Sequence, residues 1–127
     1  MNMLNLLVVE DDPIQRKTLR KLIEHLGSHC VFDCASLTEA ASILKSTPEI
    51  SGAFIDLVLQ DGNGLEVAKL CAEHDVLTVF TTSTNDDHNS RLMWDYGPVL
   101  PKPVTLPMLA QALRFFRALK CSARLTY

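Results

Sequence analysis

The chain has 127 residues, 47% of them hydrophobic, and a formal charge of −3, which suits one domain with a single buried core. This slight acidity argues against a dedicated nucleic-acid binder and against an electrostatic membrane anchor, because both normally carry a basic surface. The longest apolar runs are far shorter than a membrane span, and the N-terminus lacks the basic and apolar regions of a signal peptide. A cytoplasmic protein without membrane contact is therefore expected. Residues 1–127 are expected to form one domain, with a structured core over about residues 4–120.

The first strand and helix are the clearest elements. Residues 4–9 form a short continuous apolar run, as expected for a strand that is buried on both faces of a parallel sheet. Three acids and Pro13 follow, and a proline suits the first turn of a helix. Apolar residues then recur at helical spacing up to a stop at Gly27, with basic residues on the other side. The apolar series comprises Ile14, Leu19, Leu22, Ile23 and Leu26.

The remainder of the chain repeats this strand and helix alternation. Further strands are expected at residues 29–34, 52–57, 76–82 and 99–101. A capping box at 36–39 opens a helix to about residue 45, and other helices are expected around 65–71, 84–96 and 105–120. The four cysteines form no C-x-x-C pair and are expected to be buried free thiols (Cys30, Cys34, Cys71 and Cys121).

Five strand–helix units in strict alternation predict an α/β fold. The expected architecture is a doubly wound five-stranded parallel sheet with helices on both faces and right-handed crossovers. In the strand order 2-1-3-4-5 the first and third strands are neighbours. Their carboxyl ends then meet at the switch point, where ligands bind in open α/β sheets.

The residues that end the strands carry the chemistry. The first strand ends at Glu10 and Asp11, the third at Asp56, the fourth at Thr81 and Thr82, and the fifth at Lys102. Two carboxylates about 4 Å apart repel by roughly 4 kcal/mol at an effective dielectric near 20, so the cluster needs a cation. Carboxylate and carbonyl oxygens select Mg²⁺ or Mn²⁺. A nucleophilic carboxylate, a hydroxyl and a lysine beside such an ion predict phosphoryl transfer.

Four segments of the chain resemble the receiver domains of two-component response regulators. They are LLVVEDDP, FIDLVLQDGNGLEVA, FTTS and LPKPV, and the resemblance covers essentially the whole chain. It implies the flavodoxin-like and CheY-like form of the doubly wound fold. It also implies a part in two-component signal transduction, with phosphoryl transfer from a histidine kinase or a histidine phosphotransfer protein.

The resemblance assigns a role to each site residue. Asp56 would be the phosphoacceptor, and Asp11, Asp56 and the Val58 carbonyl would bind Mg²⁺ directly, while Glu10 acts mainly through water. Thr82 would bond a phosphoryl oxygen, and Lys102 would pair with the phosphoryl group. The domain would catalyse only its own phosphorylation and dephosphorylation, and is not expected to be an enzyme acting on a metabolite.

The sequence departs from the family pattern in two places that bear on the site. Val99 occupies the position at which the family usually has an aromatic residue. In the family, the coupling of that aromatic residue to the threonine usually reports phosphorylation. The interval from Asp56 to Lys102 is several residues shorter than usual, so Thr81 is an alternative to Thr82 for the hydroxyl role. Thr82 is favoured because Ser83 then aligns with the small residue of the family.

The resemblance also implies an output face, the surface that changes on phosphorylation and binds the downstream partner. It is expected to comprise residues 84–96, 99–101 and 105–120, and the same surface is a candidate homodimer interface. Trp94 and Tyr96 could form a partner surface there, although a partly buried tryptophan is the commoner outcome. The basic residues of the first helix could equally dock a kinase-side helix bundle or form a solvated face. Two other functions are compatible with parts of this pattern: a receiver-fold docking module that works without phosphorylation, and a Mg²⁺-dependent aspartyl phosphatase. The phosphatase chemistry usually needs a second acid where Val58 stands.

Overall fold

The computed structural model describes residues 4–27, 29–47, 49–83 and 94–125, with side chains described up to residue 120. Five strands form a parallel sheet in the order β2-β1-β3-β6-β7. They are β1 (Asn5–Val9), β2 (Cys30–Cys34), β3 (Gly52–Asp56), β6 (Leu77–Thr82) and β7 (Val99–Pro101). Counted along the chain, this is the predicted order 2-1-3-4-5, so the predicted doubly wound fold is confirmed.

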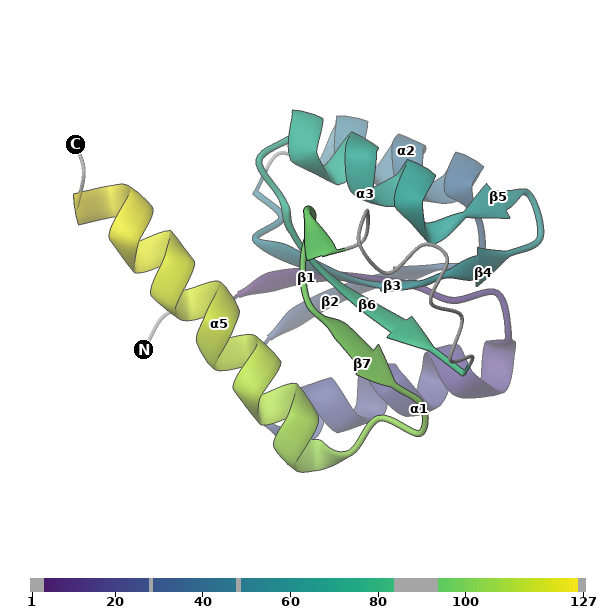
Figure 1. The fold of residues 1–127 in the computed structure, drawn as a ribbon, viewed down its shortest axis with the longest axis horizontal. Coiled ribbons are helices and arrows are strands. Elements are labelled where there is room, and N and C mark those ends of the chain that lie inside the picture. Colours follow the sequence, from purple (N-terminus) through teal and green to yellow (C-terminus); the bar gives the residue numbers. More distant parts are fainter. Residues whose placement is uncertain (1–3, 28, 48, 84–93, 126–127) are drawn as a thin grey trace.

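Helices cover both faces of the sheet (Figure 1). Helices α2 (Leu37–Ser46) and α3 (Gly64–Glu73) lie on one face, and α1 (Pro13–His25) and α5 (Leu106–Leu125) lie on the other. The last helix continues five residues beyond its expected end at residue 120, and its C-terminal part projects past the sheet. The predicted helix over 84–96 falls largely outside the described residues.

Strand β1 shows why continuous apolar runs form the centre of this fold. Its alternate side chains enter two separate cores: Leu7 and Val9 pack toward α2 and α3, whereas Leu6 and Val8 pack toward α1 and α5. All four side chains are at most 1% exposed. A strand sandwiched in this way has no solvent face and therefore no polar alternation, as the sequence indicated.

A small hairpin follows β3 and was not predicted. Strands β4 (Val58–Leu59) and β5 (Gly62–Asn63) pair antiparallel across the turn that contains Asp61. Asp61 accepts hydrogen bonds from the backbone N–H groups of Leu37 (2.9 Å) and Thr38 (3.2 Å), which lowers its pKa. The carboxylate thus supplements the Ser36 cap of α2, which accepts from Glu39 N at 3.1 Å, and attaches the hairpin to that helix.

Three expectations about burial are wrong. Ile14, assigned to the apolar side of α1, is 77% exposed, and Trp94, for which partial burial was the commoner expectation, is 60% exposed. Cys30 is exposed on the edge strand β2, whereas Cys34 and Cys71 are buried as expected, and burial raises the pKa of both thiols to about 12. The side chain of Cys121 lies outside the described residues. Among the described helices, none combines the length and the apolar character needed to cross a bilayer.

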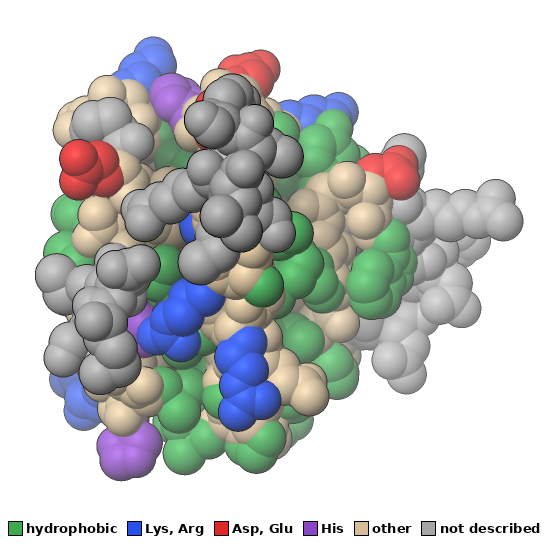
Figure 2. Space-filling model, turned by 90° about the vertical axis from the view of Figure 1, so that its left-hand side faces the viewer, with side chains coloured by type: hydrophobic (Ala, Val, Ile, Leu, Met, Phe, Trp, Pro, Cys, Tyr) green, Lys and Arg blue, Asp and Glu red, His purple; other side chains and the backbone are tan. Residues whose placement is uncertain are grey.

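The apolar arc of α5 divides between core and surface. The buried side chains are Leu109, Ala112, Leu113 and Phe116, the last of which packs edge-on against Phe54. Leu119, on the adjoining stripe, is 40% exposed. Figure 2, which views the end of the molecule from which α5 projects, shows hydrophobic side chains exposed among basic ones. Most of the arc is therefore core, and its C-terminal end reaches the surface.

Candidate functional site

The carboxyl ends of the parallel strands bring the predicted site residues to one edge of the sheet. Glu10 directly follows β1, and Asp56 is the last residue of β3, which pairs with β1. On its other side, β3 pairs with β6, so that Asp56 lies opposite Thr81, and β6 pairs in turn with β7. The order of the strands alone therefore places Glu10, Asp56 and the threonines beside one another, as expected.

Three carboxylates converge at this edge. Glu10, Asp11 and Asp56 each offer an oxygen, and these oxygens lie within 4.8 Å of one another. Glu10 and Asp56 are buried, with 3% and 7% of their surface exposed. Charges of one sign at this separation repel by several kcal/mol at an effective dielectric near 20, so this arrangement requires compensating positive charge.

Lys102 supplies one positive charge to the cluster. Its Nζ donates to Glu10 Oε1 at 2.7 Å, to Gln15 Oε1 at 2.8 Å and to Asp56 Oδ2 at 3.0 Å. The backbone places the lysine here because β7 runs into Lys102, whose N–H donates to the Thr82 carbonyl at 2.8 Å. When all three carboxylates are ionised, one ammonium beside them leaves two negative charges in excess.

The ionisation of the site reflects burial and this shortage of positive charge. Burial raises the pKa of Glu10 from 4.5 to about 7, against the lowering effect of its hydrogen bond from Lys102. Burial also acts to lower the pKa of Lys102, but its hydrogen bonds to Glu10 and Asp56 outweigh that effect and raise the pKa above its usual value. The lysine therefore remains charged at neutral pH.

The loop after β3 orients the Asp56 carboxylate. Its Oδ1 accepts from the backbone N–H of Val58 at 3.2 Å, while Oδ2 accepts from Lys102. The loop closes through a hydrogen bond from Gly64 N to Leu57 O at 2.9 Å. A Cβ at Gly64 would lie 2.6 Å from the Asp56 carbonyl oxygen, so only glycine allows this approach. The two Asp56 oxygens thus have different partners, one backbone and one lysine.

The first turn of α1 closes the other side of the site. Asp12 caps this helix by accepting from Ile14 N at 2.8 Å and Gln15 N at 3.2 Å, a role for which aspartate is a preferred residue. The Asp12 N–H in turn donates to Glu10 Oε2 at 3.2 Å. Arg16 Nη1 donates to the Glu10 carbonyl at 2.9 Å, which joins the helix start to the end of β1.

Gln15 and Arg16 are site residues that sequence reasoning missed. Both lie outside the apolar series of the predicted helix, on a side where most side chains are solvated. The signal that could have found them is their position in the first turn after a strand that ends at the sheet edge.

The donor set fits a hard divalent cation. Carboxylate oxygens from Glu10, Asp11 and Asp56 are ligands that Mg²⁺ and Mn²⁺ prefer, and the charge of such an ion balances the two excess negative charges of the fully ionised cluster. Val58, whose carbonyl is the further predicted ligand, begins β4 two residues after Asp56. Within the described residues, this is the one group of three or more acid, histidine or cysteine side chains close enough to share a metal ion.

The comparisons with known proteins identify the family. The family model for the response regulator receiver domain matches residues 6–114. The chain belongs to this family. The resemblance drawn from the four sequence segments is therefore confirmed.

Solved receiver domains share the fold over nearly their whole length. A CheY-like receiver domain from Methylobacillus flagellatus is 26% identical, with a TM-score of 0.81 over 91% of this chain and 99% of that chain. A receiver domain from Clostridium thermocellum is 21% identical, with a TM-score of 0.86 over 95% and 99%. The signal receiver domain of a modulated diguanylate cyclase from Desulfovibrio desulfuricans G20 is 26% identical, with a TM-score of 0.79 over 90% and 93%. The comparison with curated proteins gave no match.

Both candidate threonines lie at the site edge of this receiver domain. Thr81 is 2% exposed and lines a groove of about 390 Å³ together with Glu10 and Lys102. Thr82 is 8% exposed, and its backbone pairs β6 with β7 at Pro101. Val99, which replaces the usual aromatic, is half-buried and packs against the core beneath α3. The choice of Thr82 for the hydroxyl role stays a prediction.

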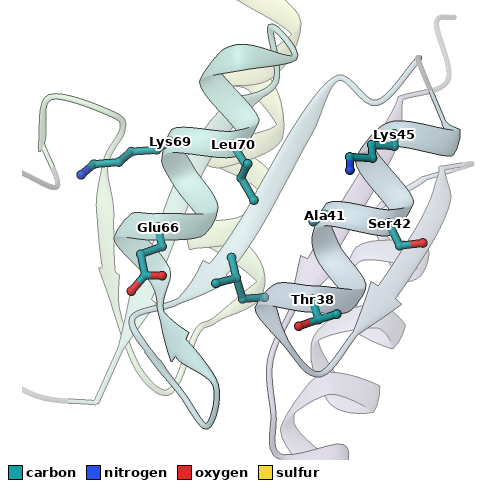
Figure 3. A pocket seen from close by; sticks show the side chains of 8 residues that line it. Thr38, Ala41, Ser42, Lys45, Glu66, Lys69 and Leu70 are labelled. Carbon is teal, nitrogen blue, oxygen red and sulfur yellow. The ribbon is translucent and has the colours of Figure 1, made fainter.

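A second, larger groove lies between α2 and α3. Figure 3 shows its walls, from which Thr38, Glu66, Lys45 and Lys69 project at separate places. Its volume is about 690 Å³. These polar groups do not converge on one point as the carboxylates at the sheet edge do. The smaller groove beside Lys102 therefore remains the candidate site.

Proposed function

We propose that this receiver domain accepts a phosphoryl group on Asp56 and acts as a switch in two-component signalling. The observation that carries the proposal is the contact of Lys102 Nζ with Asp56 Oδ2 at 3.0 Å inside a cluster of three carboxylates. A carboxylate that is buried, oriented by a backbone N–H and paired with an ammonium is held in a fixed attacking position.

The proposed reaction is phosphoryl transfer from a phosphohistidine of a kinase or phosphotransfer protein. An Asp56 carboxylate oxygen attacks the phosphorus, the new P–O bond forms, the P–N bond breaks, and the imidazole nitrogen leaves with its electron pair. Lys102 pairs with the transferred oxygens, and a hydroxyl of β6 donates to one of them. Mg²⁺ held by Asp11, Asp56 and the Val58 carbonyl, with Glu10 acting through water, would neutralise the phosphoryl charge.

The surface of α1 beside the groove fits the docking of the phosphodonor protein. Ile14 is 77% exposed there, and the exposed Lys17 and Lys21 add positive charge. The basic face is smaller than the sequence suggested, because Arg16 and Arg20 both form ion pairs with Asp33. An exposed apolar residue at the mouth of the site suits a transient protein contact.

The proposal is tested by the intact-protein mass after incubation with acetyl phosphate and Mg²⁺. We expect one phosphoryl adduct on the unmodified protein and none on Asp56→Asn or in EDTA. Asp61→Asn is the matched control, because Asp61 is an exposed acid of the neighbouring turn, and it should still give the adduct. No adduct on folded, Mg²⁺-binding protein would refute the phosphoacceptor role and favour a docking module that works without phosphorylation.

The two threonines of β6 give a paired prediction. Thr82→Ala should lower the rate of phosphoryl uptake by about tenfold or more, because a hydrogen bond to a charged group contributes roughly 1.5–3 kcal/mol. Thr81→Ala should change the rate by less than about twofold, because in this assignment the Thr81 hydroxyl does not contact the phosphoryl group and so contributes little to the barrier. The rates come from time courses of the adduct at saturating Mg²⁺. The opposite ranking would assign the hydroxyl role to Thr81.

A further inference from the structure

Gln15 connects the start of α1 to the lysine of the site. Its Oε1 accepts a hydrogen bond from Lys102 Nζ at 2.8 Å. Its Nε2 donates to Asp12 Oδ2 at 3.4 Å, on the residue that caps the helix. The side-chain amide is therefore held at both ends, by the cap on one side and by the ammonium on the other.

This contact accounts for the third hydrogen atom of the Lys102 ammonium. A lysine has three N–H donors, and here they go to Glu10, Gln15 and Asp56. Glu10 and Asp56 are acids, so each compensates positive charge as well as accepting a hydrogen bond. Gln15 is the neutral acceptor of the three, and it fixes the direction of the ammonium without consuming any of its charge.

We propose that Gln15 is a positioning residue that holds the Lys102 ammonium over Asp56 and keeps its charge available for the phosphoryl group. This inference rests on the proposed function. When Asp56 carries a phosphoryl group, a phosphoryl oxygen takes the place of Oδ2 as the acceptor of the third N–H. The hydrogen bonds to Glu10 and Gln15 hold the other two N–H groups in place during that change, so the lysine needs no reorganisation.

Three variants separate this role from simple packing. Gln15→Leu removes the acceptor at similar volume, and Gln15→Glu keeps an acceptor but adds a charge that competes with the phosphoryl group. Gln111→Leu is the matched control, because Gln111 is an exposed glutamine on α5. Two readouts are used: the rate of adduct formation with acetyl phosphate and Mg²⁺, and the protection of the Lys102 ammonium protons from exchange in the NMR spectrum.

We expect both Gln15 variants to take up the phosphoryl group about fivefold more slowly than the unmodified protein, the loss that corresponds to one hydrogen bond. Protection of the ammonium protons should be lost in Gln15→Leu and kept in Gln15→Glu, and Gln111→Leu should match the unmodified protein in both readouts. An unchanged rate in Gln15→Leu, or a slower rate with protection intact, would overturn the positioning role. If the unmodified protein forms no adduct, the proposed function fails, while the NMR readout still tests the contact with Lys102.

Discussion

Lys102→Met is expected to lower the rate of phosphoryl uptake by roughly a hundredfold or more, the usual effect of removing one donor from a developing anion. The ammonium contacts Asp56 Oδ2 at 3.0 Å and Glu10 Oε1 at 2.7 Å. Without the ammonium, the attacking carboxylate lies beside two other acids. A cation bound at the adjoining carboxylates is then the remaining group that can neutralise the phosphoryl charge. The measurement is the initial rate of adduct formation at saturating Mg²⁺.

The same variant has a second expected effect, on stability without metal. Loss of the ammonium leaves Glu10 and Asp56 buried without their counter-charge, and breaking such a pair is destabilising. We expect a lower urea midpoint in EDTA, with recovery when Mg²⁺ is added. Lys69→Met is the matched control, because Lys69 is an exposed lysine on α3. A Lys102→Met protein with near-normal uptake would show that the lysine has no part in the transfer.

Gly97→Ala is expected to reduce the free energy of unfolding by about 3 kcal/mol or more, at the upper end of overpacking effects. A Cβ at Gly97 would lie 1.8 Å from the carbonyl oxygen of Thr78. The obstacle is backbone in β6, so it cannot be removed by a side-chain rotation. Relief requires β7 to shift, and β7 leads directly to Lys102.

Urea unfolding followed by circular dichroism measures this loss. Gly62→Ala is the matched control, because a Cβ there would meet the ends of two side chains, Leu37 at 3.1 Å and Glu66 at 3.4 Å. Both side chains can move, so the control should lose far less stability. Equal midpoints for the two variants would contradict the close approach of residue 97 to β6.

The sequence predicted the elements whose physical signals are local. Continuous apolar runs identified the central strands, and the acids that ended them identified the site, because parallel strands bring their carboxyl ends to one edge. The Asp12 and Ser36 caps were likewise readable from residue type and spacing. The two-residue strands β4 and β5 were missed, since a period of two cannot be recognised over two residues.

Contacts between distant segments could not be read in this way. Gln15 and Lys102 lie far apart in the sequence, and no periodicity links them. Ile14 fits the helical spacing of the apolar series but belongs to the first turn of α1, where it is exposed at the mouth of the groove. Asp61 is of a residue type common in turns, but its contact with the start of α2 depends on how the hairpin folds back.

The most direct test of the central claim is to locate the phosphoryl group within the chain. Protein incubated with acetyl phosphate and Mg²⁺ would be treated with borohydride, which reduces an acyl phosphate to the alcohol, then digested and sequenced by mass spectrometry. The account predicts conversion of Asp56 to homoserine, and no other converted residue. Conversion at Asp11 or another acid, with Asp56 unchanged, would contradict it.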